Sequence, residues 1–217
     1  MNLDYSVIIG KLPLFIEGCW VTLQISFFAL LLGMVFGIGG ALCRISTNRF
    51  LSRMAFLYVW IIRGTPVMVQ LFILYFGLPQ LGIKMSSMTA GILGLAINTG
   101  AYITEIIRGG IQAIDKGQLE AALSLGMKYR QAMTRIIGPQ AIKVCIPPLV
   151  NQFIMTLKNS SIASLVTITE LFRTGEQLIY TTFRSFEVYT IVAVLYLIMN
   201  SVFMIIADKL EKRMARQ

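Results

Sequence analysis

Glu120-Ala121-Ala122-Leu123-Ser124-Leu125-Gly126 is a short polar helical stretch between two apolar segments that are long enough to cross a bilayer. Asp115-Lys116-Gly117-Gln118, directly before it, fits a capping box in which Asp115 accepts from the backbone at residue 118. Gly126 supplies a helix stop, so the predicted helix covers about 116–126. A helix this short is marginal in isolation. We therefore expect another protein to dock on it.

The composition around this stretch is typical of a polytopic membrane protein. Of the 217 residues, 56% are hydrophobic and 13% are charged, whereas soluble proteins have about 45–50% apolar and about 25% charged residues. A helix that rises about 1.5 Å per residue needs about 20 residues to cross about 30 Å of hydrocarbon. We predict an all-α fold with one membrane domain over 1–217 and five spans, at about 19–43, 54–77, 88–108, 138–157 and 188–208.

Two of these spans contain helix breakers. The fourth includes Pro147-Pro148 and reaches spanning length only if Lys143 snorkels to the headgroups. The second contains Arg63-Gly64-Thr65-Pro66, where Pro66 removes the hydrogen bond to residue 62 and predicts a kink with an unpaired carbonyl. Arg63 within a span is either part of a functional site or a side chain that snorkels to the inner headgroups.

Two further segments have recognisable patterns. Gly33 and Gly37 in the first span form a small-xxx-small pair, which predicts close packing on another helix, by default of the same chain. The outer residues 159–168 are apolar but too short to span, so we expect a re-entrant or interfacial element.

The distribution of basic residues predicts the orientation. The formal charge of +9 comes from residues at the span ends and not on one soluble face, so nucleic acid is not an expected partner. With the N-terminus outside and the C-terminus cytoplasmic, five basic residues lie outside: Lys11, Lys84, Lys158, Arg173 and Arg184. Thirteen then lie inside: Arg44, Arg49, Arg53, Arg108, Lys116, Lys128, Arg130, Arg135, Lys143, Lys209, Lys212, Arg213 and Arg216.

The sequence predicts neither a metal site nor a disulfide framework. It contains no histidine, and Cys19, Cys43 and Cys145 are odd in number, without metal spacing, and lie in or at the spans. No catalytic residue and no cofactor of the chain's own are expected.

Several motifs carry a resemblance to a known family. Glu120-Ala121-Ala122, Gly126 and Pro139 resemble the EAA loop of permease subunits in bacterial ATP-binding-cassette (ABC) importers, although Gly138 stands where that family usually has Leu. Motifs over about residues 18–213 resemble its polar amino acid branch: Arg63-Gly64-Thr65-Pro66, Gln70-Leu71, Ile97-Asn98-Thr99-Gly100-Ala101-Tyr102, Glu105-Ile106-Ile107-Arg108, Pro139-Gln140-Ala141, Asn151-Gln152-Phe153-Ile154 and Leu157-Lys158-Asn159-Ser160-Ser161.

This resemblance implies a type I ABC importer permease fold in a bacterial plasma (inner) membrane, working by alternating access. Glu120, Ala121, Ala122 and Gly126 would form a coupling helix that docks on an ATPase subunit. The implied partners are two ATPase subunits that carry ATP and Mg, a second permease chain that is identical or similar, and an extracytoplasmic amino acid-binding protein. The chain itself lacks the G-x-x-x-x-G-K-[ST] phosphate loop and is not expected to be an enzyme.

The resemblance also implies a substrate site at Asn98, Gln152 and Lys158, with Gln70 and Asn159 as weaker candidates. Lys158 can hold an α-carboxylate, whereas Asn98 and Gln152 offer donors and acceptors. The alternative is that these residues form interhelical hydrogen bonds without touching a ligand. Neutral Gln152 favours a neutral substrate such as cystine or glutamine. A basic amino acid (arginine, histidine or lysine), an ATP-independent secondary transporter and a docking scaffold remain alternatives.

Overall fold

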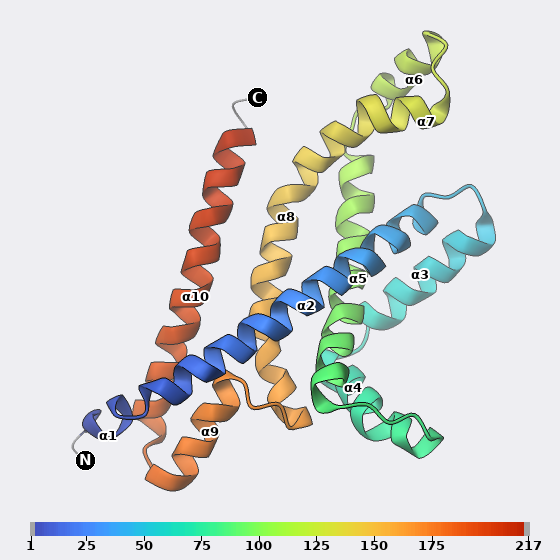
Figure 1. Cartoon of the computed structure of the whole chain (residues 1–217). Coiled ribbons are helices and arrows are strands. Elements are labelled where there is room, and N and C mark those ends of the chain that lie inside the picture. Colours follow the sequence, from blue (N-terminus) through green and yellow to red (C-terminus); the bar gives the residue numbers. More distant parts are fainter. Residues whose placement is uncertain (1–2, 215–217) are drawn as a thin grey trace.

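The computed structural model describes residues 3–214, and within them every regular element is a helix. Arg216, one of the predicted cytoplasmic basic residues, lies outside the described residues. The α-helices in chain order (Figure 1) are α1 Ser6–Ile9, α2 Leu12–Arg44, α3 Arg49–Arg63, α4 Val67–Phe72, α5 Ser87–Gln112, α6 Lys116–Ser124, α7 Tyr129–Ala132, α8 Gly138–Asn159, α9 Leu171–Thr182 and α10 Ser185–Met214. Short η elements link them: η1 Ile73–Gly77, η2 Leu78–Leu81, η3 Met133–Ile137 and η4 Ser160–Val166.

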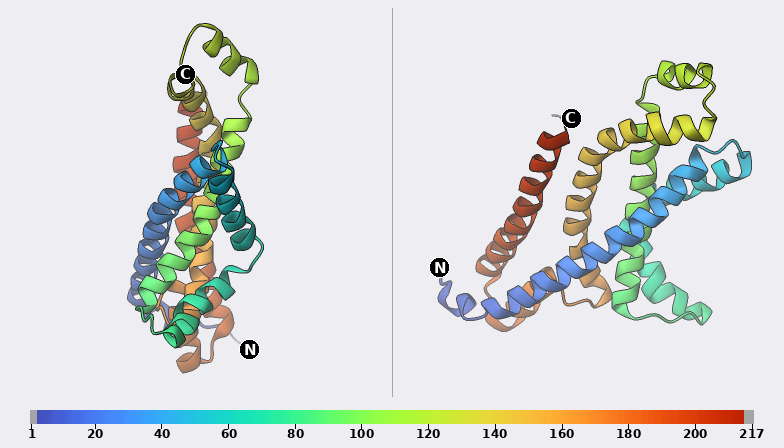
Figure 2. Two further views of the ribbon diagram at one scale, coloured as in Figure 1. Left: turned by 90° about the vertical axis from the view of Figure 1, so that its right-hand side faces the viewer. Right: turned by 45° about the horizontal axis from the view of Figure 1, so that its top comes forward.

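The long helices run between two ends of an elongated molecule. The N-terminal helix α1, the α4 segment and α9 lie at one end, and α6, α7 and the C-terminal end of α10 lie at the other (Figures 1 and 2). Between these ends the chain passes along α2, back through α3 and α4, then along α5, α8 and α10. Each pass therefore reverses the direction of the one before it.

Three of these passes are helices that are long and apolar enough to cross a membrane: α2, α5 and α10. The α3 and α4 pair passes the same test only as a unit, bent by 103°. The expected kink near Pro66 is thus a break between two helices and not a bend within one. Helix α8 has 22 residues and carries Pro147 and Pro148 inside it. The first span also begins earlier than expected, at Leu12.

Helix α2 crosses the molecule and packs closely on α5 (Figure 1). At the crossing, Gly33 faces Thr99, and a Cβ built on Gly37 would lie 2.3 Å from Cγ2 of Ile103. The small-xxx-small pair therefore packs within the same chain, as expected. Because a side chain at Gly37 has no room, this glycine sets how closely the two helices approach.

A buried carboxylate joins three elements at the N-terminal end. Glu170 is fully buried and caps α9, accepting from the backbone N–H of Arg173 at 2.8 Å and of Phe172 at 3.0 Å. Its Oε2 also accepts from the hydroxyls of Tyr196 on α10 and Thr22 on α2, at 2.8 and 3.3 Å. Burial raises the pKa of the Glu170 carboxyl, and these four donors oppose that rise.

Two local expectations can be compared with the structure. Asp115 caps α6 as expected, but its side chain accepts from the N–H of Gly117 at 2.6 Å and not from that of Gln118, which donates to the Asp115 backbone carbonyl at 3.1 Å. The apolar stretch 159–168 forms η4, in which Ser160, Ala163, Ser164 and Val166 are buried. It packs against α4, α5 and α8 and so dips into the protein.

Candidate functional site

Several polar residues of α5 are buried inside the chain. Asn98 is 7% exposed, and Thr99 and Thr104 on the same helix are also buried. Asn98 Nδ2 donates to Oε1 of Gln70 on α4 at 3.1 Å. Two of the predicted substrate residues, Asn98 and Gln70, are therefore bonded to each other.

Gln70 also satisfies the backbone at the break between α3 and α4. Its Nε2 lies 2.8 Å from the carbonyl oxygen of Ile62, 3.1 Å from that of Thr65 and 2.9 Å from Thr65 Oγ1. The Ile62 carbonyl is the one that Pro66 leaves without its helical donor. The expected unpaired carbonyl thus exists, and the Gln70 side chain caps it.

The other predicted substrate residues lie on or next to α8. Helix α8 is joined to α5 by a 2.9 Å hydrogen bond between the hydroxyls of Thr99 and Thr156. Gln152, one turn before Thr156, is half-buried, and Lys158 is exposed at the end of the helix. Within residues 3–214, no hydrogen bond joins the side chain of Gln152, Lys158 or Asn159 to Asn98.

A second polar group lies between α2, α3 and α5, towards the α6 end. Glu105 pairs with Arg108 at 2.6 Å and with Arg44 at 3.4 Å. The guanidinium of Arg63 lies 5.0 Å from the ring centroid of Tyr102, which places it within cation–π range. Arg44, Arg63, Tyr102 and Glu105 are among the residues that line a cavity of about 380 Å³. Arg63 is exposed and contacts Tyr102, so both interpretations of this residue, as part of a functional site or as a snorkelling side chain, stay open.

The predicted docking helix is α6, which projects with α7 beyond the long helices (Figures 1 and 2). Glu120 and Ala121 are exposed, whereas Ala122 is 1% exposed and holds the helix against the rest of the chain. Gly126 has φ of +81°, a left-handed conformation that favours glycine. The Met127 N–H donates to the Ala122 carbonyl at 3.2 Å and closes the helix end.

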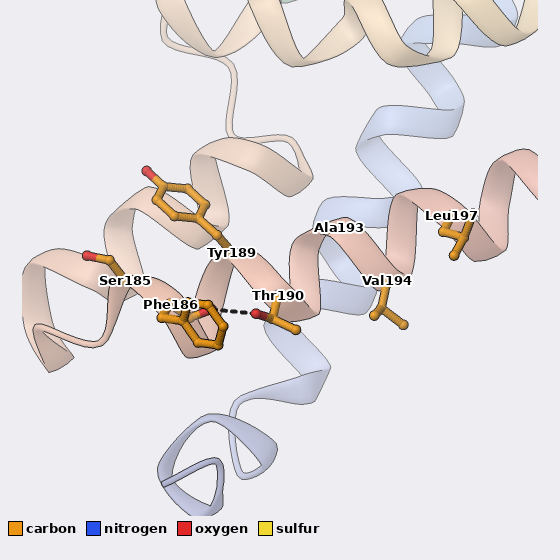
Figure 3. Close-up of a pocket in the computed structure, with 7 residues that line it drawn as sticks. All are labelled: Ser185, Phe186, Tyr189, Thr190, Ala193, Val194 and Leu197. Carbon is orange, nitrogen blue, oxygen red and sulfur yellow. Dashed lines mark hydrogen bonds between the residues drawn. The ribbon is translucent and has the colours of Figure 1, made fainter. Parts of the chain in front are cut away.

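An apolar hollow of about 660 Å³ lies along the outer face of α10 (Figure 3). Ser185, Phe186, Tyr189, Thr190, Ala193, Val194 and Leu197 line it, all from this one helix. Thr190 Oγ1 donates to the backbone carbonyl of Phe186 at 2.7 Å, so this hydroxyl is already satisfied. Apart from Ser185 and Tyr189 the remaining lining is apolar and suits cover by lipid or another chain.

Comparison with known proteins places this arrangement in a family. Residues 27–216 match the family described as binding-protein-dependent transport system inner membrane component. The chain belongs to this family. The long apolar helices of this inner membrane component are therefore membrane helices.

Two curated relatives are similar over nearly their whole length. This inner membrane component is 38% identical to the arginine transport system permease protein ArtQ of Bacillus subtilis over 215 residues, which cover 99% of this chain and 98% of the relative. It is also 38% identical to the glutamine transport system permease protein GlnP of Escherichia coli over 216 residues, 99% of each chain.

Solved structures show the same fold. A crystal structure of an amino acid ABC transporter with histidines superposes with a TM-score of 0.94 at 42% identity, over 98% of this chain and 100% of that chain. A chain of the MetNI methionine ABC transporter, in inward facing conformations, gives a TM-score of 0.80 at 22% identity, over 94% of this chain and 98% of that chain. This inner membrane component has the type I ABC permease fold.

Some of the residues that organise the site were missed by sequence reasoning. Glu170 precedes a predicted span and looks like any surface carboxylate, yet it is buried and caps α9. Tyr58 donates to the Ile97 carbonyl at 2.7 Å and ties α3 to α5. No spacing in the sequence signals the contacts of Glu170 with Thr22 and Tyr196 or that of Tyr58 with Ile97, because these partners are distant in the chain. No group of metal-ligating side chains occurs among the residues that the structure describes.

Proposed function

We propose that this chain is the transmembrane permease subunit of an ATP-driven importer of polar amino acids. The observation that carries the proposal is the full-length likeness to an amino acid ABC transporter, at 42% identity and a TM-score of 0.94. The relatives named for arginine and glutamine transport support the same substrate class.

The proposed topology has five spans in one permease domain over 1–217. Three of the spans are α2, α5 and α10. The other two are the bent pair α3 and α4, counted as one span, and the proline-containing α8. The N-terminus lies outside and the C-terminus in the cytoplasm. The positions of α1 and of the C-terminal end of α10 at opposite ends of the molecule support an odd number of crossings (Figure 1).

Substrate would bind at Asn98, Gln152 and Lys158, with Gln70 and Asn159 at the margin of the site. The buried amide of Asn98 and the exposed ammonium of Lys158, which joins none of the ion pairs of residues 3–214, support these roles. A neutral amino acid such as glutamine or cystine is our first candidate. A basic amino acid is the second, because one relative is named for arginine and one related structure contains histidines.

Energy would enter through α6. In this proposal Glu120, Ala121, Ala122 and Gly126 form a coupling helix on a separate ATPase subunit, which binds ATP and Mg. Two ATPase subunits, a second identical or similar permease chain and an extracytoplasmic binding protein complete the importer. Closure of the ATPase pair would draw the two coupling helices together and move the spans between inward-open and outward-open states.

Reconstitution in proteoliposomes tests this function. Amino acid uptake is expected only with the binding protein outside, the ATPase subunits present and ATP inside. Uptake that persists without ATPase subunits would instead indicate a secondary transporter. Thermal shifts of the binding protein with glutamine, cystine, arginine, histidine and lysine would separate the two substrate candidates.

Substitutions on α6 test the coupling helix. Glu120→Ala removes an exposed charge that can pair with the ATPase. Gly126→Ala places a side chain at φ of +81°, at a cost of about 1–2 kcal/mol. We expect both to lower uptake and substrate-stimulated ATPase activity several-fold, with normal membrane insertion. Gly109→Ala is the control, because a Cβ there meets nothing within 4 Å. Unchanged coupling in both α6 variants would contradict the assignment.

A further inference from the structure

The amide of Gln70 is held in one orientation by the backbone around it. Three oxygen atoms, those of Ile62, Thr65 and the Thr65 hydroxyl, lie within 3.1 Å of Nε2. If the amide were turned over, its oxygen would face the two backbone carbonyls, which cannot donate. The break at Pro66 therefore decides which end of the Gln70 amide points away from α3.

The end that points away from α3 is Oε1, and it determines the orientation of Asn98. Oε1 can only accept, so Asn98 must turn its Nδ2 towards it, as the 3.1 Å contact shows. Both side chains are at most 9% exposed, so water cannot readily replace this bond. Asn98 Oδ1 is consequently the atom that faces away from Gln70.

Asn98 Oδ1 is also the atom of this pair that is open to a ligand. Residues 3–214 offer it no hydrogen-bond donor. It is not among the fully buried, unpartnered side-chain atoms of these residues, so this oxygen keeps some accessible surface. An acceptor in that position suits a donor on the substrate, such as an α-ammonium or an amide N–H.

We propose that Gln70 is a positioning residue that fixes the Asn98 amide so that its carbonyl oxygen, and not its NH₂ group, faces the substrate. This inference rests on the proposed function, because it takes Asn98 as a substrate contact. Gln70 then acts on selectivity without touching the substrate: it makes this point of the site select a hydrogen-bond donor.

Two Gln70 variants distinguish a role in positioning the Asn98 amide from a role that only stabilises the break between α3 and α4. Gln70→Met removes both the donors to the backbone and the acceptor for Asn98. Gln70→Lys keeps donors for the backbone carbonyls but offers Asn98 no acceptor, so the Asn98 NH₂ group is no longer held. Positioning predicts that both variants bind poorly. Support of the break alone predicts that Lys preserves binding whereas Met does not.

The measurement is equilibrium binding of radiolabelled L-glutamine, L-cystine and L-arginine to the complete permease–ATPase complex in nanodiscs. For the amino acid that the wild type binds, Gln70→Met is expected to weaken binding at least about tenfold, the loss of one hydrogen bond to a charged group. Gln70→Lys is expected to weaken binding to a similar extent, although it still donates to the backbone. The control is Gln80→Met, at an exposed glutamine of η2.

A double-mutant cycle gives a second, independent result. If Gln70 acts through Asn98, adding Gln70→Met to Asn98→Ala weakens binding no further. Additive losses, or a Gln70→Lys complex that binds as tightly as the wild type, would overturn the inference. A wild-type complex that binds none of the three amino acids, or an Asn98→Ala complex that binds normally, would instead remove Asn98 from the proposed substrate site.

Discussion

Lys158 is the residue whose proposed role depends most directly on its charge. It is exposed at the end of α8, next to the Thr156 that bonds to Thr99 on α5. A lysine without a structural ion pair can be removed with little effect on the fold, because surface charges contribute little to stability.

Lys158→Ala is expected to reduce amino acid uptake at least about tenfold, the value of one charge-assisted hydrogen bond to a carboxylate. Assembly and the melting temperature of the complex are expected to stay unchanged. Lys84→Ala is the matched control, because Lys84 is exposed in the segment between η2 and α5. Wild-type uptake kinetics in Lys158→Ala would contradict the role as a carboxylate anchor.

The sequence predicts the contacts of individual residues well where the signal for them is local. Pro66 indicated the unpaired carbonyl of residue 62, because proline has no N–H to donate. It could not show that Gln70 caps this carbonyl or that Asn98 holds Gln70, since these contacts depend on how α4 and α5 pack. The pattern also predicts Asp115 as a helix cap, but it places the side-chain bond at residue 118, whereas the side chain accepts from Gly117.

At the scale of elements, the packing of α2 on α5 depends on missing side chains. A Cβ on Gly37 would lie 2.3 Å from Ile103 Cγ2, so the helices must separate or Ile103 must move. Overpacking of this kind costs about 1–3 kcal/mol. Gly37→Ala is therefore expected to lower the melting temperature of the complex in detergent. Gly39→Ala, on the same helix with nothing within 4 Å of its Cβ, is expected to leave it unchanged.

The Glu170 carboxylate also acts between elements, because it joins α2, α9 and α10. Glu170 accepts from two backbone N–H groups and two hydroxyls. In Glu170→Gln an NH₂ group replaces one oxygen and faces donors, so at least one buried donor loses its acceptor. That loss costs about 1–3 kcal/mol. Glu170→Gln is expected to lower the melting temperature, and exposed Thr169→Ala is not. Equal melting temperatures would show that Glu170 is not a structural link.

Hydropathy identifies some of the helices better than others, for a physical reason. Helices α2, α5 and α10 each contain an apolar stretch of spanning length, which hydropathy detects. Helix α8 packs against α5 and carries two prolines, and its apolar stretch is shorter. Helix α9 is fixed by the buried contacts of Glu170 with distant residues, and η4 by its packing on α4, α5 and α8, and a sequence window cannot register these.

At the scale of the whole molecule, the alternation of the five passes predicts the sidedness of every loop. Helix α1 and element η2 lie at one end, and α6 and the C-terminal half of α10 at the other (Figures 1 and 2). If α3 and α4 were a re-entrant loop that returned to its side of entry, α5 could not begin at the end opposite α6. We therefore propose that the bent pair crosses the membrane once.

Cysteine labelling tests this sidedness. In a background with Cys19, Cys43 and Cys145 replaced by Ala, single cysteines would be introduced as Lys11→Cys, Gln80→Cys, Ser124→Cys and Lys209→Cys, all at exposed positions. A membrane-impermeant maleimide is expected to label the first two in intact spheroplasts and the last two only after the membrane is opened. The basic residues predict this direction, because they gather at the α6 end. Labelling of Gln80→Cys and Ser124→Cys from the same side would exclude a crossing by α5.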